Sequence, residues 1–227
     1  KQKAMAAKSL YRNLAWRNIG PDIISGRVSE VQGVSGNKNI IWASFATGGF
    51  WKTEDGGNSW SSLFDKDATL SIGSFHTAPS NQNIIYLGTG EANIFRASLP
   101  GTGVYKTMDG GKTWKHVGLE NAGTISRVIV HPTNADIAYV ASTGNEWSYA
   151  GDKGLFMTSD GGKSWKRIIK DSKSGVIDLV MDPTDPNILY ASEWNRTRLR
   201  WSDPTPQDGD FIWKSTDGGK SWKKLTN

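Results

Sequence analysis

The sequence of 227 residues has no cysteine, three histidines and no apolar run long enough to cross a membrane. Without cysteine, neither a disulfide nor a thiolate metal site holds the fold. The histidines, His76, His116 and His131, lack metal-ligand spacing, and no calcium loop, P-loop or G-x-S-x-G motif is present. We therefore predict no membrane span, no metal and no cofactor.

The formal net charge of +5 raises the question of nucleic-acid binding. Many lysines, however, stand beside tryptophans of a repeated segment, where we expect the outermost strand of each repeat to meet solvent and benefit from charge. These are Lys112, Lys115, Lys163, Lys166, Lys220, Lys223 and Lys224. We predict no nucleic-acid partner. The N-terminal KQKAMAAKSL lacks the apolar core of a signal peptide, so a trimmed or mature N-terminus is the simplest interpretation.

Tryptophan and glycine are abundant, and both are concentrated in a segment that occurs four times. The copies are WKTEDGGNSW, YKTMDGGKTW, FMTSDGGKSW and WKSTDGGKSW, which begin at residues 51, 105, 156 and 213. The shared positions include an aspartate and a tryptophan: Asp55, Asp109, Asp160 and Asp217, with Trp60, Trp114, Trp165 and Trp222. Because a catalytic carboxylate is not normally needed four times, we interpret these residues as structural.

The repeated segment has the chemistry of a tight hairpin turn. The aspartate carboxylate is expected to accept hydrogen bonds from N–H groups one to three residues on. The paired glycines supply positive φ, and the Ser or Thr hydroxyl two residues before the aspartate ties the turn to itself. The tryptophan is expected to begin the return strand and bury its ring against the neighbouring repeat.

The pattern S/T-x-D-x-G-x-S/T-W resembles the Asp-box, or BNR repeat, of sialidases, sortilin-type ectodomains, some endoglucanases and large secreted bacterial proteins described as sortilin-like or glycosyl-hydrolase-like. The resemblance runs from about Trp16 to the end and implies a β-propeller. Four-stranded blades agree with the rest of the chain, because alternating apolar segments, Asn/Asp/Pro turns and boxes recur every 51 to 57 residues.

We therefore predict an all-β propeller of four-stranded antiparallel blades. Residues 1–14 form a tail, and 15–227 form the propeller: a closing strand at 15–21 and blades at about 25–64, 68–118, 123–170 and 174–227. The four blades are expected to be the N-terminal part of a larger propeller, with a closed four-blade ring as the alternative. The rest of the propeller or a second chain is expected to cover the open blade edge.

The strand order of such blades puts the Asp-boxes on one face and the long insertions, 90–103, 144–154 and 194–210, on the other. Charged and aromatic side chains on loops over a rigid scaffold are typical of a binding surface, although blade packing is the alternative. Four first-strand residues, Glu30, Ser74, Arg127 and Asp178, are expected at one equivalent position lining the channel. The predicted ligand-binding residues are Arg27, Asn93, Arg96, Arg127, Trp147, Trp194 and Arg196.

Catalytic signatures are incomplete. Phe95 to Pro100 matches the Arg-Ile-Pro motif of sialidases poorly. The resemblance to Asp-box endoglucanases implies a catalytic aspartate two residues before a Gly-Gly pair, where this chain has Ala46-Thr47-Gly48-Gly49. The remaining catalytic candidates are Glu91, Glu146 and Glu193, which we expect at comparable places at the ends of second strands.

The sequence thus predicts a bacterial propeller, either secreted or located in the periplasm or cell envelope, that binds a protein or polysaccharide through its long loops. The alternative is a glycoside hydrolase, sialidase-like or endoglucanase-like, or a lyase, with part of its active site outside this segment. A structural subunit that docks through its open edge is a third hypothesis.

Overall fold

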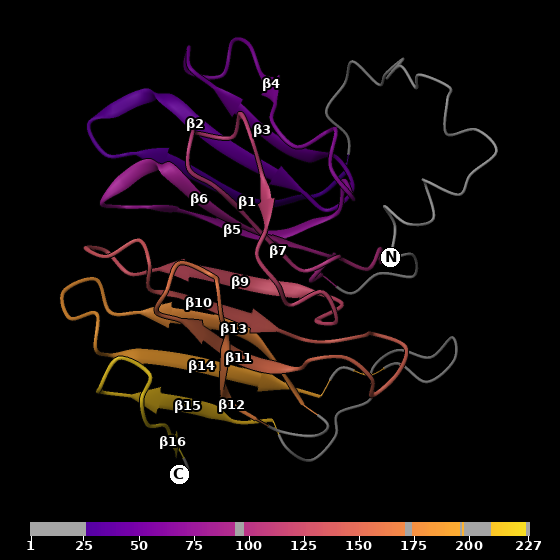
Figure 1. Ribbon diagram of the computed structural model, residues 1–227, viewed down its shortest axis with the longest axis vertical. Coiled ribbons are helices and arrows are strands. Elements are labelled where there is room, and N and C mark those ends of the chain that lie inside the picture. Colours follow the sequence, from indigo (N-terminus) through magenta and orange to yellow (C-terminus); the bar gives the residue numbers. More distant parts are fainter. Residues whose placement is uncertain (1–25, 94–97, 171–173, 196, 198–209, 226–227) are drawn as a thin grey trace.

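The computed structural model describes residues 26–93, 98–170, 174–195, 197 and 210–225. Four antiparallel sheets, one for each box, follow one another from the indigo to the yellow end of the chain (Figure 1). The predicted all-β fold of four-stranded blades is confirmed. The predicted tail and the closing strand at 15–21 lie outside the described residues.

Each sheet contains four strands in chain order. Blade 1 consists of β1 (Val28–Val34), β2 (Asn37–Phe45), β3 (Gly49–Thr53) and β4 (Ser61–Ser62). Blade 2 consists of β5 (Ile72–Ala78), β6 (Asn81–Thr89), β7 (Val104–Thr107) and β8 (Lys115–His116). Blade 3 consists of β9 (Ile125–Val130), β10 (Ala138–Ser142), β11 (Gly154–Thr158) and β12 (Lys166–Ile169). Blade 4 consists of β13 (Gly175–Met181), β14 (Leu189–Trp194), β15 (Ile212–Ser215) and β16 (Lys223–Leu225).

The box turns are built alike in all four blades. In blade 1, Thr53 Oγ1 donates to Asp55 Oδ1 at 2.7 Å and accepts from the Gly57 N–H at 2.9 Å. Asp55 accepts from the Ser59 N–H at 2.9 Å, four residues on and one position beyond the predicted range. The paired box glycines all have φ between 70° and 98°, as predicted. The turn is closed by its own side chains, which explains why the motif recurs whatever the rest of the blade does.

Hydrophobic cores lie between consecutive blades. Between blades 1 and 2, Phe50 packs edge-on against Phe75 with ring centroids 4.7 Å apart. The box tryptophans of blades 2 and 3 reach back, as expected: Trp114 Nε1 donates to the Leu63 carbonyl at 2.8 Å, and Trp165 Nε1 donates to the Val117 carbonyl at 2.7 Å. Blades 2 and 3 are therefore each fixed to the blade before them by both apolar packing and a directed hydrogen bond.

The two outer faces of the stack expose the residue types that the inner faces bury. Val31 of blade 1 is 57% exposed, whereas Phe75 at the equivalent position of blade 2 is fully buried. On blade 4, Val180, Tyr190 and Ile212 are exposed. Both faces have the composition of a blade-to-blade interface. Within the described residues, no helix has the length and apolarity that membrane spanning requires.

Each first strand carries a bulge that the sequence did not reveal. The register skips Ser29, Gly73, Ser126 and Ile177, one residue before the predicted channel position in every blade. A Cβ on Gly73 would lie 1.9 Å from the Ile125 carbonyl oxygen of blade 3. The bulge therefore brings adjacent blade backbones into contact near the axis.

Candidate functional site

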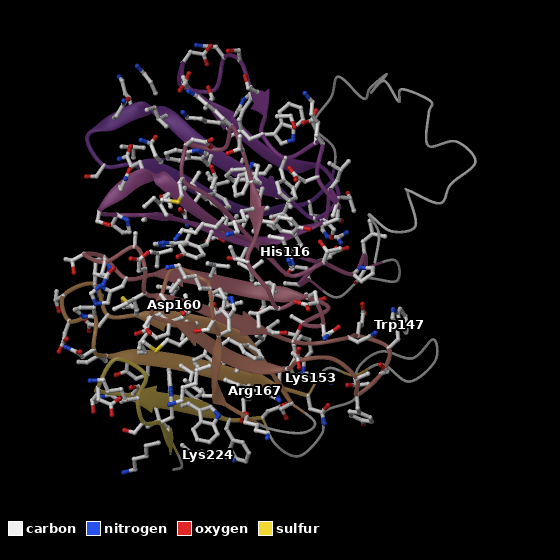
Figure 2. All side chains as sticks on the ribbon, in the orientation of Figure 1. His116, Trp147, Lys153, Asp160, Arg167 and Lys224 are labelled. Carbon is white, nitrogen blue, oxygen red and sulfur yellow. The ribbon has the colours of Figure 1, made fainter. Side chains whose placement is uncertain are left out.

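The antiparallel strand order puts the β3–β4 type of turn, which contains the box, at one end of each blade and the β2–β3 type of connection at the other. Figure 2 shows this for blade 3, where Asp160 of the box and Trp147 of the insertion lie at opposite ends. We call the end that carries the connections after β2, β6, β10 and β14 the insertion face. The candidate site is built from the residues at this end and along the axis.

An ion pair joins blades 1 and 2 at the insertion face. Arg27 precedes β1, and its guanidinium contacts the carboxylate of Glu91, which follows β6. Glu91 is 1% exposed, while the Arg27 side chain is 46% exposed. The Glu91 backbone N–H donates to the Leu99 carbonyl at 3.0 Å, so the returning insertion holds the backbone that carries the carboxylate. The pair leaves a guanidinium partly open to solvent above a buried acid.

Two aromatic rings stand exposed on the blade 3 insertion. Trp147 is 40% and Tyr149 is 43% exposed. The Trp147 N–H donates to Asn145 Oδ1 at 2.8 Å, and the Asn145 N–H donates to the Ala150 carbonyl at 3.4 Å. Because hydrogen bonds within the loop hold its backbone, the rings are presented without much loss of conformational freedom on binding.

Buried polar groups gather where blades 3 and 4 meet at the insertion face. Lys153, 2% exposed, donates from Nζ to Thr197 Oγ1 at 3.0 Å, and its ammonium lies 5.2 Å from the centroid of the Tyr149 ring. Glu146 and Glu193 are each 5% exposed. Burying a charged side chain is costly unless it has polar partners. We therefore infer that these side chains have defined polar partners within the protein.

The three candidate acids do not occupy equivalent places, and this expectation was wrong. From the strand register, Glu193 matches Thr89 and Ser142 within their strands, whereas Glu91 follows its strand by two residues. Glu146 lies further along its loop. Counting residues from sequence motifs missed this because the second strands end at different positions: β6 at Thr89, β10 at Ser142 and β14 at Trp194.

The predicted axial set occupies one register position. Glu30, Ser74, Arg127 and Asp178 pair with Ser44, Gly88, Ala141 and Ser192. Arg127 donates from Nε to Asp178 at 2.7 Å and from Nη1 to Glu30 at 3.2 Å. The Ser74 hydroxyl donates to Glu30 at 2.6 Å. Burial lowers the pKa of Arg127, but its bonds to Asp178 and the charge of Glu30 outweigh burial and raise it.

Backbone groups complete this axial network. The Phe75 N–H donates to Glu30 Oε2 at 3.0 Å, and the Val128 N–H donates to Ser74 Oγ at 3.0 Å. Two residues after Ser74 in β5, His76 makes a similar contact between blades: its Nδ1 accepts the Val130 N–H at 3.3 Å. Burial lowers the pKa of His76 to about 4, and the Arg127 charge acts in the same direction, so the imidazole is neutral at pH 7. The network joins all four blades, and its members satisfy one another.

The remaining predicted residues are scattered. Asn93 is exposed at the start of its insertion, and Trp194 is half-buried at the end of β14. Arg96 and Arg196 lie outside the described residues. Ala46, 2% exposed, occupies the place where the endoglucanase resemblance implies an aspartate, and its N–H donates to the Arg27 carbonyl. Lys153 and Thr197 were missed, because nothing in their sequence neighbourhood indicates burial.

Comparison with known proteins identifies the family of this chain. A family model described as sortilin, neurotensin receptor 3 (Sortilin-Vps10) matches residues 102–227. The chain belongs to the sortilin-Vps10 family. The matched region contains the boxes of blades 2 to 4, so the Asp-box resemblance seen in the sequence is confirmed.

Curated relatives of this family member include enzymes. Xyloglucanase Xgh74A of Acetivibrio thermocellus is 26% identical over 243 residues, covering 92% of this chain and 27% of the enzyme. A probable oligoxyloglucan-reducing end-specific xyloglucanase of Neosartorya fischeri is 24% identical, covering 83% of this chain and 26% of that protein. The chain thus spans about a quarter of the length of the curated relatives it matches.

Solved structures share the fold. An ancestral GH74 enzyme superposes with a TM-score of 0.64 at 20% identity, covering 90% of this chain and 26% of that one. YCF48 bound to D1 peptide superposes with a TM-score of 0.54 at 14% identity, covering 93% of this chain and 57% of that one. At these identities the likeness concerns the β-propeller fold alone.

Proposed function

We propose that this chain is a recognition module of a secreted or periplasmic cell-envelope protein, and that its insertion face binds a polysaccharide. The observation that carries the proposal is the pair of exposed rings, Trp147 and Tyr149, on a hydrogen-bonded loop. Flat aromatic surfaces beside fixed polar groups suit the apolar faces and hydroxyl edges of sugars. The xyloglucanase relatives support a polysaccharide over the alternative protein ligand.

Arg27 and Arg127 have different places in this proposal. Arg27 is half-exposed at the insertion face and is positioned to donate to ligand hydroxyls while it remains paired with Glu91. Arg127 is committed to Glu30 and Asp178, so its first role is to hold the blades, with ligand contact secondary. The rest of the propeller, or a second chain, is proposed to cover the exposed faces of blades 1 and 4.

The double variant Trp147→Ala/Tyr149→Ala tests the proposal in the intact natural protein. Binding of xyloglucan, measured by isothermal titration calorimetry, is expected to weaken about tenfold or more, because exposed aromatic anchors contribute over about 1 kcal/mol each. Met108→Ala is the matched control, since Met108 is 70% exposed on a box turn at the other end of blade 2. Equal affinities for the parent and the double variant would refute the proposed role of the rings.

A hydrolase is the second candidate, favoured by the relatives and by the buried carboxylate of Glu91. Pairing with a guanidinium favours the carboxylate form, which acts as a base or nucleophile in glycoside hydrolysis. The absence of an acid at Ala46 argues against the endoglucanase arrangement. Release of reducing ends from xyloglucan by the intact protein, lost in Glu91→Gln, would establish the hydrolase and displace the pure binding module.

A further inference from the structure

The box segments of blades 2, 3 and 4 are rich in positive charge, and the turns between first and second strands at the same end add the acids Asp136, Asp182 and Asp185. Residues 107–116, 158–167 and 215–224 together contain eight Lys or Arg side chains and three aspartates. Their excess of five positive charges equals the formal net charge of the whole protein. Two exposed lysines recur in each segment, and we call these six the lysine strip: Lys112, Lys115, Lys163, Lys166, Lys220 and Lys223.

The box fold does not require these lysines. Blade 1 has Asn58 and Ser61 at the two positions, and its turn makes the same hydrogen bonds from Thr53 and Asp55. None of the six lysine side chains forms a hydrogen bond or ion pair within the described parts of the chain. The strip is therefore neither a product of the turn nor a set of intramolecular salt bridges.

The positive charges of blades 2 and 3 are brought close together. Lys106 of β7 donates from Nζ to the Gly161 carbonyl of the next box at 3.1 Å. This places its ammonium beside the loop that contains Lys163, where the negative charges of Asp136, 3.7 Å away, and of Asp160 partly offset the repulsion. Burial lowers the pKa of Lys106, and the charge of Lys163 acts in the same direction. Neighbouring like charges repel, and a bound anion removes that cost.

Among the described residues, the box aspartates form no ion pair with the strip lysines. Each is held by hydroxyl and backbone N–H donors of its own turn, as Asp160 is by Ser164 at 2.5 Å and by the Ser164 N–H at 3.0 Å. Their oxygens are thus occupied inside the turn, whereas the lysines point charge toward solvent on either side of it. An incoming anion meets the ammonium groups first.

We propose that the lysine strip binds a linear acidic polysaccharide that carries uronate or sulfate groups and crosses the box ends of blades 2 to 4. A lysine ammonium is a point charge on a flexible side chain, whereas an arginine guanidinium makes a rigid bidentate contact. Several lysines therefore suit a polymer with repeating anionic groups better than a single carboxylate or phosphate held in fixed geometry. Single-stranded nucleic acid requires exposed stacking surfaces. In the three segments the only large hydrophobic side chain that is exposed is Met108, and the box tryptophans are partly buried.

This site lies at the other end of the blades from the insertion face, so it goes beyond the proposed function and neither depends on the other. The test uses the intact natural protein and four probes: polygalacturonate, heparin, neutral xyloglucan and duplex DNA. Affinities are measured by biolayer interferometry at about 50 mM and about 200 mM NaCl, the range over which polyanion contacts weaken strongly.

The decisive variant is Lys163→Asn/Lys220→Asn, which copies the box of blade 1. Its matched control is Lys66→Asn/Lys170→Asn, which removes two exposed lysines from the connections after β4 and β12, at the insertion end. We expect polygalacturonate or heparin to bind in a salt-sensitive way, the box variant to lose about tenfold in affinity and the control less than about twofold.

Three results would overturn the proposal. The first is that neither acidic polysaccharide binds at the lower salt concentration. The second is equal losses in the two double variants, which would reduce the effect to net charge. The third is tighter binding of duplex DNA than of both polysaccharides, which would replace the polysaccharide with nucleic acid. Unchanged thermal unfolding of the Lys163→Asn/Lys220→Asn protein confirms that any lost binding is not lost folding.

Discussion

Replacing Arg127 with methionine should loosen all four blades, because this guanidinium bridges blade 4 and blade 1 across the axis. It holds Asp178 at 2.7 Å and Glu30 at 3.2 Å, and Glu30 in turn accepts from Ser74 and Phe75 of blade 2. Methionine keeps much of the apolar stem and removes the charge. The two carboxylates then face each other without a cation.

The magnitude follows from burial. Removing one partner of a fully buried ion pair costs about 3–5 kcal/mol, and exposed pairs contribute at most about 1 kcal/mol. The Arg127 side chain is 35% exposed, Glu30 is 13% and Asp178 is 47% exposed. Glu30 also keeps its hydroxyl and N–H donors. We expect Arg127→Met to lower the free energy of unfolding by about 1–3 kcal/mol.

Urea denaturation followed by tryptophan fluorescence measures this loss, with Lys166→Met as the control because Lys166 is exposed and its side chain makes no ion pair with any residue that the structure describes. Hydrogen exchange supplies a local measurement: the amides of Phe75 and Val128 should exchange faster in the variant. A double-mutant cycle with Glu30→Gln isolates the pair. A loss no larger than that of the control, or a coupling energy below about 0.3 kcal/mol, would refute the bridging role.

Three further predictions concern the stability of the four blades. Gly73→Ala should destabilise the protein by at least about 1–3 kcal/mol in urea denaturation, because its Cβ would collide with the Ile125 carbonyl at 1.9 Å. Asp55 and Asp217 have pKa values lowered to about 2, chiefly by serine hydroxyl hydrogen bonds. The two carboxylates stabilise the folded state fully above their ordinary pKa of 3.8, and this stabilisation is lost as pH falls through about 2. Asparagine variants should therefore show a flatter dependence of the free energy of unfolding on pH in that range. The pKa of His76 is lowered from 6.5 to about 4, mainly by burial, so stability should fall as pH drops from 6.5 to about 4 and His76→Asn should remove that slope in thermal unfolding.

The repeated parts of the fold could be predicted from the sequence because each is specified locally. The aspartate, hydroxyl and glycine pair of a box lie within five residues and close the turn by themselves, as Thr53, Asp55 and Gly57 do. Alternation within the first strands, counted from the turns, was enough to place Glu30, Ser74, Arg127 and Asp178 at one register position.

The contacts between blades could not be predicted, because they join residues far apart in the sequence. Arg27 and Glu91 become an ion pair only when blades 1 and 2 are stacked. The bulges had no common signature, since two of the skipped residues are serines, Ser29 and Ser126, and the other two are Gly73 and Ile177. Bulge position depends on how adjacent backbones meet, which is a property of the assembled stack.

The four blades also provide an internal control for separating structure from function. A residue needed to build a blade should recur at its register position, as the box aspartates do. Glu91, by contrast, lies two residues after β6, and Thr47 lies at that distance after β2 of blade 1. Trp147 and Tyr149 belong to an insertion whose length and sequence differ from those of the other blades. The strip lysines recur in three blades but not in the first, although that blade folds alike. Since the shared architecture does not demand the exposed side chains among these, Trp147, Tyr149 and the strip lysines are the positions where substitution should alter binding before it alters stability.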